Sequence, residues 1–195
     1  MQVKNKAIKK KSKIPTTGRI GRITKLLAQE TNWSLVEKIL KGAEAFPNFS
    51  SVERADFLRE AVKRMENEIG KNTTIKILQA CGQMCCGVTR RKFVKKLMGE
   101  TKSLEEFVEK LNKTHVGGGR LKFRNKNTIV GGYDRCFCGA VNKTKVLFPN
   151  LTYCHCSTGW YKQLFETALN RPVKVEIRQS IITGAKKCEF VIHIQ

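Results

Sequence analysis

Residues 153–177 read YCHCSTGWYKQLFETALNRPVKVEI, and this stretch contains a helical pattern followed directly by an extended one. Apolar residues recur at three- and four-residue spacing, which predicts a helix from about residue 157 to residue 169. Residues 173–177 alternate apolar and polar side chains instead, as a half-buried strand does. The segment therefore predicts a helix packed close to a sheet.

The rest of the chain changes character at the glycine run of residues 117–119. Before it, apolar spacing near 3.6 residues and recurring cap residues predict helices over most of residues 23–113. After it come short β-like runs and a terminal antiparallel hairpin, expected at residues 121–123, 128–130, 145–148, 173–177 and 188–194. We therefore expect an α+β fold with a helical N-terminal half packed on a C-terminal antiparallel sheet with one main helix.

Three regions follow from this division. Residues 1–20 are expected to be a flexible basic arm, residues 21–115 a helical region, and residues 116–195 an α+β domain that binds a metal or a ligand. The formal charge is +22, and nine basic residues lie between Lys4 and Lys25 with no acid before Glu30. Such a charge permits nonspecific contact with nucleic acid through residues 1–25, but a basic surface without interleaved aromatic residues is more often a solvated face.

The cysteines are the main chemical signal. Two Cys-x-Cys pairs are separated by fifteen residues, and each pair can aim two thiolates at one point. Two such pairs complete a tetrahedral sulfur shell, which indicates zinc, with an iron–sulfur cluster as the alternative. Redox-active or simply buried cysteines remain open as other interpretations. The candidate metal ligands are Cys136, Cys138, Cys154 and Cys156, with Cys188 in reserve.

A third group of thiols stands earlier in the chain, at Cys81, Cys85 and Cys86. Cys81 and Cys85 are an i, i+4 pair on a predicted helix, where a buried apolar stripe also places small residues. Burial is therefore the favoured interpretation, and their role stays open.

The chain carries no apolar signal segment and no run of about 18 apolar residues. We therefore expect a cytoplasmic protein without a membrane span, in which stable disulfides are disfavoured. A homodimer is one possible oligomeric state, and the sequence leaves this choice open.

Three motifs near the C-terminus carry a resemblance: the run Tyr153–Glu166, the strand pattern Val173-Lys174-Val175-Glu176 after Arg171-Pro172, and the closing Gly184–Phe190 segment with Cys188. Together they resemble the end of a 4-vinyl-reductase-type domain, over about residues 120–195. The whole chain also resembles an uncharacterised prokaryotic cysteine-rich family.

The resemblance implies a small-molecule sensor or carrier, since several such domains hold a cysteine-bound zinc beside a hydrophobic pocket. One departure matters, because Ser180-Ile181 stands where the family commonly carries another cysteine. The family's usual ligand set is therefore incomplete here, and Cys154 with Cys156 is a substitute.

On the predicted helix, Trp160, Tyr161 and Phe165 are candidate cofactor- or ligand-binding residues, although core packing is the default explanation of their spacing. Whether the protein is an enzyme stays open. The function expected is binding of a small molecule or metal as a sensor-like or accessory protein. The alternatives are a cysteine-dependent enzyme, either a hydrolase or a redox protein, and a nucleic-acid-associated protein acting through its basic arm.

Overall fold

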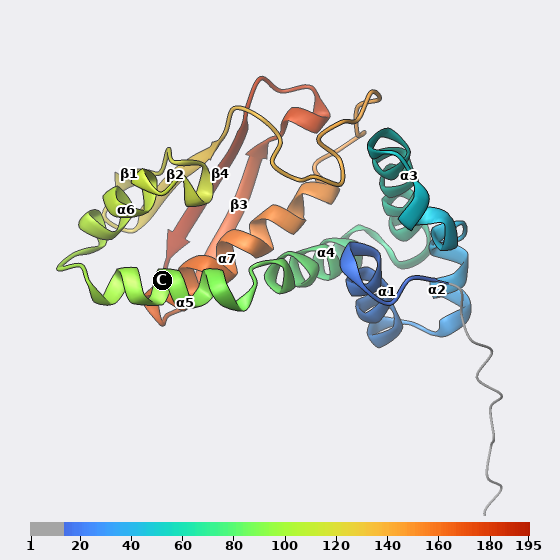
Figure 1. The fold of residues 1–195 in the computed structure, drawn as a ribbon, viewed down its shortest axis with the longest axis horizontal. Coiled ribbons are helices and arrows are strands. Elements are labelled where there is room, and N and C mark those ends of the chain that lie inside the picture. The colour runs from blue at the N-terminus through green and yellow to red at the C-terminus, as the bar shows by residue number, and fades with distance from the viewer. Residues whose placement is uncertain (1–13) are drawn as a thin grey trace, which may run out of the picture.

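The computed structural model describes residues 14–195, drawn in Figure 1. The α-helices are α1 (Gly18–Glu30), α2 (Trp33–Ile39), α3 (Ser51–Ile69), α4 (Lys71–Cys85), α5 (Val88–Gly99), α6 (Leu104–Lys113) and α7 (His155–Leu169). The strands are β1 (Lys122–Asn125), β2 (Thr128–Tyr133), β3 (Val173–Gln179) and β4 (Cys188–Ile194). Short 3₁₀ helices are η1 (Ala43–Asn48), η2 (Val116–Gly118), η3 (Thr152–Cys154) and η4 (Ile181–Thr183).

The four strands form one antiparallel sheet in the order β1-β2-β4-β3. The expected terminal hairpin is confirmed, since β3 pairs with β4 in a register that sets Val175 opposite Ile192. Helix α7 lies between the sheet and the pair α4 and α5, while α1, α2 and α3 gather at the far end of α4 (Figure 1). The α+β prediction is confirmed.

The core has two parts that meet along α7. One buries apolar side chains of α6 and α7 against the sheet, including Phe107, Phe165 and Phe190. The other buries α1 to α4 together with Phe148 and Tyr153 from the segment between β2 and α7. The division of the chain into a helical region (residues 21–115) and an α+β domain (residues 116–195) stays a prediction.

Two local expectations differ from the structure. The β-like run at residues 145–148 is not a strand, because Phe148 instead packs into the helical core while its N–H donates to the carbonyl oxygen of Ile182 at 2.8 Å. Most of the predicted basic arm falls outside the described residues. Its last positions belong to the fold, since α1 begins at Gly18 and Ile20 is buried.

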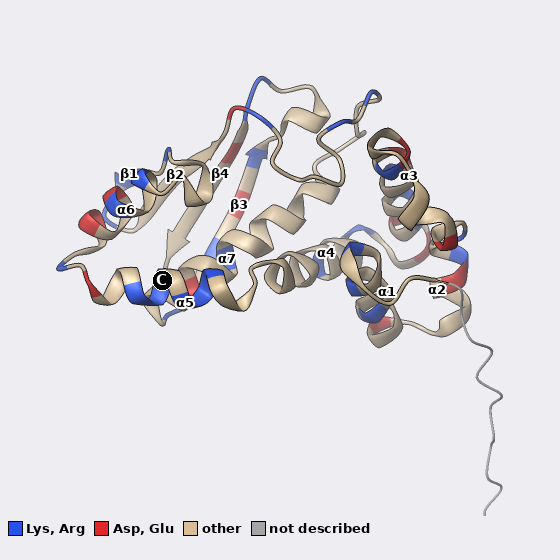
Figure 2. Cartoon of the chain, in the orientation of Figure 1, with Lys and Arg blue, Asp and Glu red and all other residues tan. Residues whose placement is uncertain are grey.

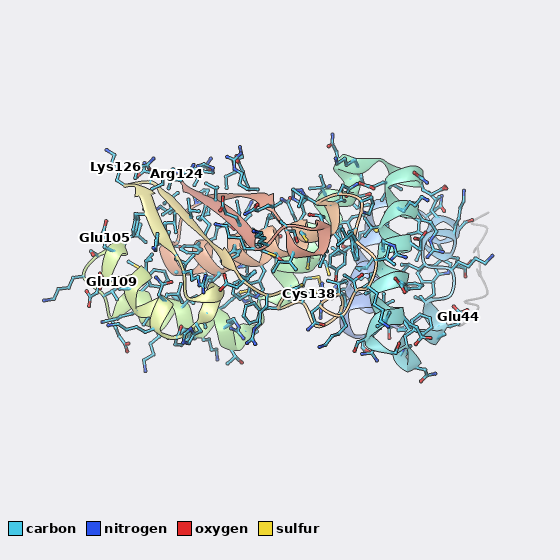
Figure 3. All side chains as sticks on the ribbon, turned by 90° about the horizontal axis from the view of Figure 1, so that it is seen from above. Glu44, Glu105, Glu109, Arg124, Lys126 and Cys138 are labelled. Atoms are coloured by element: carbon cyan, nitrogen blue, oxygen red, sulfur yellow. The ribbon has the colours of Figure 1, made fainter. Side chains whose placement is uncertain are left out.

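Charged residues are spread over the whole fold. Figure 2 shows Lys and Arg on most elements, with acidic residues among them on α3 and α6. In Figure 3 the labelled Glu44 and Lys126 lie at opposite ends, and Cys138 lies between the sheet-bearing part and the α1–α3 part. The cysteine therefore marks the junction of the two parts.

At this junction α4 and α7 cross at backbone contact. A Cβ atom on Gly82 would lie 1.8 Å from the carbonyl oxygen of Cys156, and one on Gly159 would lie 1.9 Å from that of Gln79. No side chain fits at either position, so the pair of glycines sets how closely the helices approach. The amide of Gln79 donates to Thr158 Oγ1 at 3.2 Å across the same crossing.

We expect Gly82→Ala to lower the free energy of unfolding by about 1–3 kcal/mol, because the added methyl meets backbone that no rotamer change can relieve. Gly99→Ala is the control, since a Cβ there meets nothing within 4 Å. Helix propensity alone should make that variant neutral or up to about 1 kcal/mol more stable. Urea denaturation of both variants measures the difference, and equal midpoints would show that the crossing tolerates a side chain.

Candidate functional site

Three cysteines meet at the α4–α7 crossing. Cys81 and Cys85 lie one turn apart on α4, and Cys156 lies in the first turn of α7. Their sulfur atoms all lie within 4.8 Å of one another. We call these three residues the thiol trio. Cys81 and Cys156 are buried and Cys85 is half-buried, so the trio is largely shielded from water.

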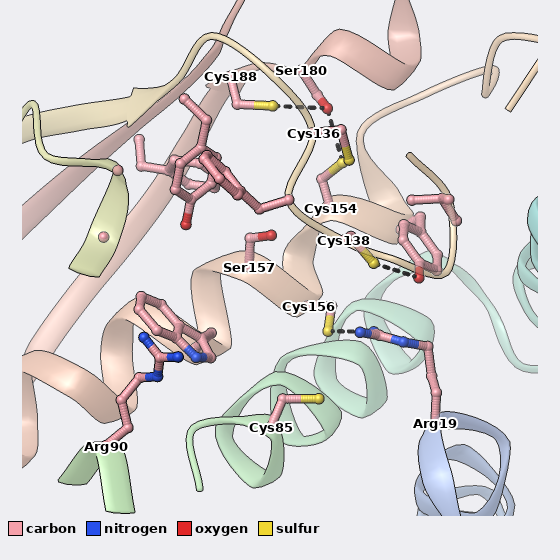
Figure 4. A pocket seen from close by; sticks show the side chains of 18 of the residues that line it. Arg19, Cys85, Arg90, Cys136, Cys138, Cys154, Cys156, Ser157, Ser180 and Cys188 are labelled. Carbon is pink, nitrogen blue, oxygen red and sulfur yellow. Dashed lines mark hydrogen bonds between the residues drawn. The ribbon is translucent and has the colours of Figure 1, made fainter. Parts of the chain in front are cut away.

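Arg19, one of two arginines on α1, reaches this trio from a helix that packs against α4. Arg19 Nη1 donates to Cys156 Sγ at 3.0 Å, and its guanidinium carbon lies 6.0 Å from the centre of the Tyr153 ring (Figure 4). Within residues 14–195 no carboxylate lies within 4.0 Å of Arg19. An arginine is charged at every physiological pH, so sulfur is the available source of negative charge.

The charge state of the trio follows from these contacts. Hydrogen bonds from Cys156 and Cys81 hold the pKa of Cys85 far below its ordinary value, and the Arg19 charge adds to that effect. Hydrogen bonds to Cys81 and Cys85, together with burial, raise the pKa of Cys156. These contacts favour a thiolate on Cys85, with the guanidinium of Arg19 close by as a counter-charge.

A cavity of about 410 Å³ opens beside the trio. Cys85, Cys156 and Arg19 line one wall, whereas Cys81 lies behind it. The size falls within the range of pockets that hold drug-sized ligands.

The opposite wall carries the other predicted ligands, and Figure 4 shows Cys136, Cys154 and Cys188 near Ser180, with Cys138 apart from them. Cys154 Sγ lies 3.0 Å from Ser180 Oγ, which in turn lies 3.6 Å from Cys188 Sγ. Cys138 Sγ lies 3.3 Å from the Tyr153 hydroxyl, and Cys136 lines the cavity beside them. We call Cys136, Cys138, Cys154 and Cys188 the second thiol group.

The second thiol group differs from the trio in its electrostatics. Burial raises the pKa of Cys154 to about 12 and that of Cys136 to about 11, so both are protonated at neutral pH. No arginine donates a hydrogen bond to these sulfurs within the described residues. The second thiol group thus lines the same cavity as Cys156 but, among the described residues, does not form a close three-thiol cluster with it. Metal binding by these predicted ligands stays a prediction.

Aromatic side chains form the remaining wall. Trp160 lines the cavity with Tyr133 and Phe190. Tyr161 is fully buried behind them, with its ring stacked on Tyr133 at a centroid distance of 5.9 Å. Phe165 lies deeper, edge-on to Phe107 in the core. Trp160 is thus the one of the three predicted ligand-binding residues that the cavity exposes.

Sequence reasoning did not identify the trio as a site. The i, i+4 spacing of Cys81 and Cys85 was the available signal, but Cys156 lies 71 positions after Cys85 and no spacing rule connects them. Arg19 was one of many basic residues in its region. The crossing of α4 and α7 brings the three cysteines together, and α1, which packs against α4, adds Arg19.

No helix of residues 14–195 is long and apolar enough to cross a membrane. No curated protein matches the chain. Among solved structures, the chain is similar to trafficking protein particle complex subunit 3 from Naegleria fowleri, in a crystal structure covalently bound to palmitic acid. The TM-score is 0.51 at 12% identity, over 74% of this chain and 94% of the other, which shows a related fold. A family model matches residues 19–195, and the chain therefore belongs to the family described as Family of unknown function (DUF6144).

Proposed function

We propose that this protein binds a zinc ion through Cys81, Cys85 and Cys156, in the wall of a cavity that receives a small molecule. The observation that carries the proposal is the thiol trio itself: three sulfurs from two helices lie within 4.8 Å of one another, with a guanidinium against one of them.

The geometry of the trio suits zinc. Tetrahedral zinc–thiolate bonds of about 2.3 Å separate the sulfurs by about 3.8 Å, so small side-chain rotations bring the trio to ligand geometry. Thiolates are the soft donors that zinc prefers over magnesium or calcium. Three protein ligands leave a fourth position for water or a ligand atom. Since Cys85 and Cys156 line the cavity, a molecule inside it would be next to the metal.

Charge balance also supports the proposal. Three thiolates around a divalent cation carry a net charge of −1, and Arg19 supplies the compensating +1. A buried site of this kind avoids the desolvation cost of an unpaired charge. A four-cysteine site in the second thiol group would carry −2 without such a partner.

Two further observations support the small-molecule part of the proposal. The C-terminal half resembles 4-vinyl-reductase-type domains, several of which hold a cysteine-bound zinc beside a hydrophobic pocket. The similar solved structure, trafficking protein particle complex subunit 3, is covalently bound to palmitic acid. The cavity of about 410 Å³ gives this chain a place for a ligand of comparable kind.

The principal test is metal content in a matched pair of variants. Protein purified without oxygen should contain about one zinc per chain, and Cys85→Ala should lose it because the trio becomes a pair. Cys86→Ala is the control: Cys86 follows directly in sequence but is buried in the core of α5 to α7 and the sheet. Elemental analysis of both variants measures the effect.

Other outcomes would redirect the assignment. Zinc retained in Cys85→Ala but lost in Cys154→Ala would move the site to the second thiol group. Iron with visible absorption would indicate an iron–sulfur cluster. Metal-free protein in which Cys85 is alkylated faster than every other thiol would favour the cysteine-dependent enzyme, since Cys85 already has thiolate character.

The metal affinity should depend steeply on pH. The hydrogen bond with Cys156 lowers the pKa of Cys81, but the hydrogen bond with Cys85 and burial together raise it by more, so the net pKa of Cys81 is raised. The pKa of Cys156 is raised as well. Both thiols are then protonated at neutral pH, and zinc must displace two protons. The apparent affinity should therefore rise about 100-fold per pH unit below the thiol pKa values, and fall as pH falls. Competition with a chromophoric chelator between pH 6 and pH 7.5 tests this, and a flat profile would argue against thiolate ligands.

Arg19→Gln should weaken zinc binding by about 10- to 100-fold, since a hydrogen bond to a charged group is worth about 1.5–3 kcal/mol. Lys25→Gln removes the same charge from an exposed position on α1 and should leave the affinity nearly unchanged. The same chelator competition compares the two variants. Equal losses in both would mean that overall charge, rather than the contact with Cys156, supports the site.

A further inference from the structure

The cavity contains no acidic side chain among the described residues that line it. The lining includes cysteine thiols and the phenols of Tyr133 and Tyr153. Its other ionisable groups are Arg19, Arg90 and His115. In the proposed metal-bound state the charge of Arg19 is balanced by the three thiolates and the ion. Burial keeps the thiols of Cys136 and Cys154 protonated, so these two contribute no negative charge. Arg90 is therefore left as an uncompensated cation at the cavity.

Arg90 is placed where it can meet a ligand. It lies near the start of α5, and its guanidinium carbon lies 5.8 Å from the centre of the Trp160 ring (Figure 4). Within residues 14–195 no carboxylate pairs with it at 4.0 Å or less. Its charge reaches the buried Tyr133 phenol, which lines the same end of the cavity. This cation–π contact places the exposed guanidinium at the rim of the cavity, against the Trp160 ring.

Aromatic rings form much of the lining near Arg90. Tyr133, Trp160 and Phe190 line the cavity, and Tyr161 contacts all three rings from behind while its hydroxyl donates to the carbonyl oxygen of Gly117 at 2.8 Å. Such walls bury an apolar ligand body, while a single cation at the rim selects the charge of its polar end.

We propose that the cavity binds an organic anion, with its apolar body against Trp160 and Phe190 and its carboxylate paired with Arg90. This inference rests on the proposed function of the cavity and adds the chemical class of the ligand. A neutral molecule of the same shape buries the same surface but forms no ion pair with the guanidinium.

The test uses two probes that differ only in charge, 1-naphthaleneacetic acid and 1-naphthaleneacetamide. Isothermal titration measures their binding to zinc-loaded full-length protein. The acid should bind about tenfold more tightly than the amide, as expected for one partly exposed charge-assisted contact.

Two variants separate a specific contact from general electrostatics. Arg90→Gln should weaken binding of the acid about tenfold and leave the amide unchanged. Arg91→Gln removes the same charge from the next residue of α5, which does not line the cavity, and should change neither probe.

The outcomes distinguish this inference from the function on which it rests. Equal binding of acid and amide, or equal losses in the two variants, would overturn the selection of an anion while leaving a working ligand cavity. Failure of both probes to bind the unaltered protein would overturn the ligand class and count against the cavity as a small-molecule site. Neither result would alter the zinc content, which is measured separately.

Discussion

The close crossing of α4 and α7 is the constraint on which the rest of the structure depends. Two glycines, Gly82 and Gly159, allow each helix to touch the backbone of the other. The crossing joins the two parts of the core, and it also brings the α4 thiols to the first turn of α7. Stability and chemistry are thus linked at one contact, because a change that separates the helices also separates the sulfurs.

Electrostatics distinguish the two walls of the cavity. Both are rich in cysteine, but among residues 14–195 an arginine hydrogen bond to sulfur occurs only at the trio, from the partly buried Arg19. A cation favours the thiolate form, while burial without one favours the neutral thiol. The same residue type therefore has two roles within one cavity: a thiolate is favoured on Cys85 of the trio, whereas Cys136 and Cys154 on the other wall are protonated. The contrast explains why cysteine count alone is a poor guide to the site.

Much of the fold could be predicted from the sequence. The periodicity of α7, the alternation of β3 and β4, and the switch at the glycine run each depend on local spacing, which the sequence displays directly. The strand predicted at residues 145–148 was wrong, because Phe148 packs into the helical core rather than pairing with another strand. Local pattern alone does not separate these two uses of the same residues.

The site was only partly predictable. Cys156 belonged to the predicted metal set and also belongs to the trio, but its partners on α4 are brought to it by a helix crossing that no spacing rule describes. Trp160 was expected at a ligand pocket and does line the cavity, whereas Tyr161 and Phe165 share its helical periodicity and lie in the core. Apolar residues on one helix can thus face either a cavity or the core, and the helical spacing of the sequence does not show which of the two each residue faces.

The contact between Arg19 and Cys156 spans 137 positions of the chain. In small zinc modules the ligands lie close together in sequence, so an ion can bind a nascent segment and direct its folding. Here α1, α4 and α7 must all be synthesised and packed before the trio and its counter-charge exist. Loop closure over such separations is slow and depends on the rest of the core. The proposed zinc ion would consequently bind after the protein has folded. The supply of metal would then determine how much of the protein contains zinc, but not whether the chain folds.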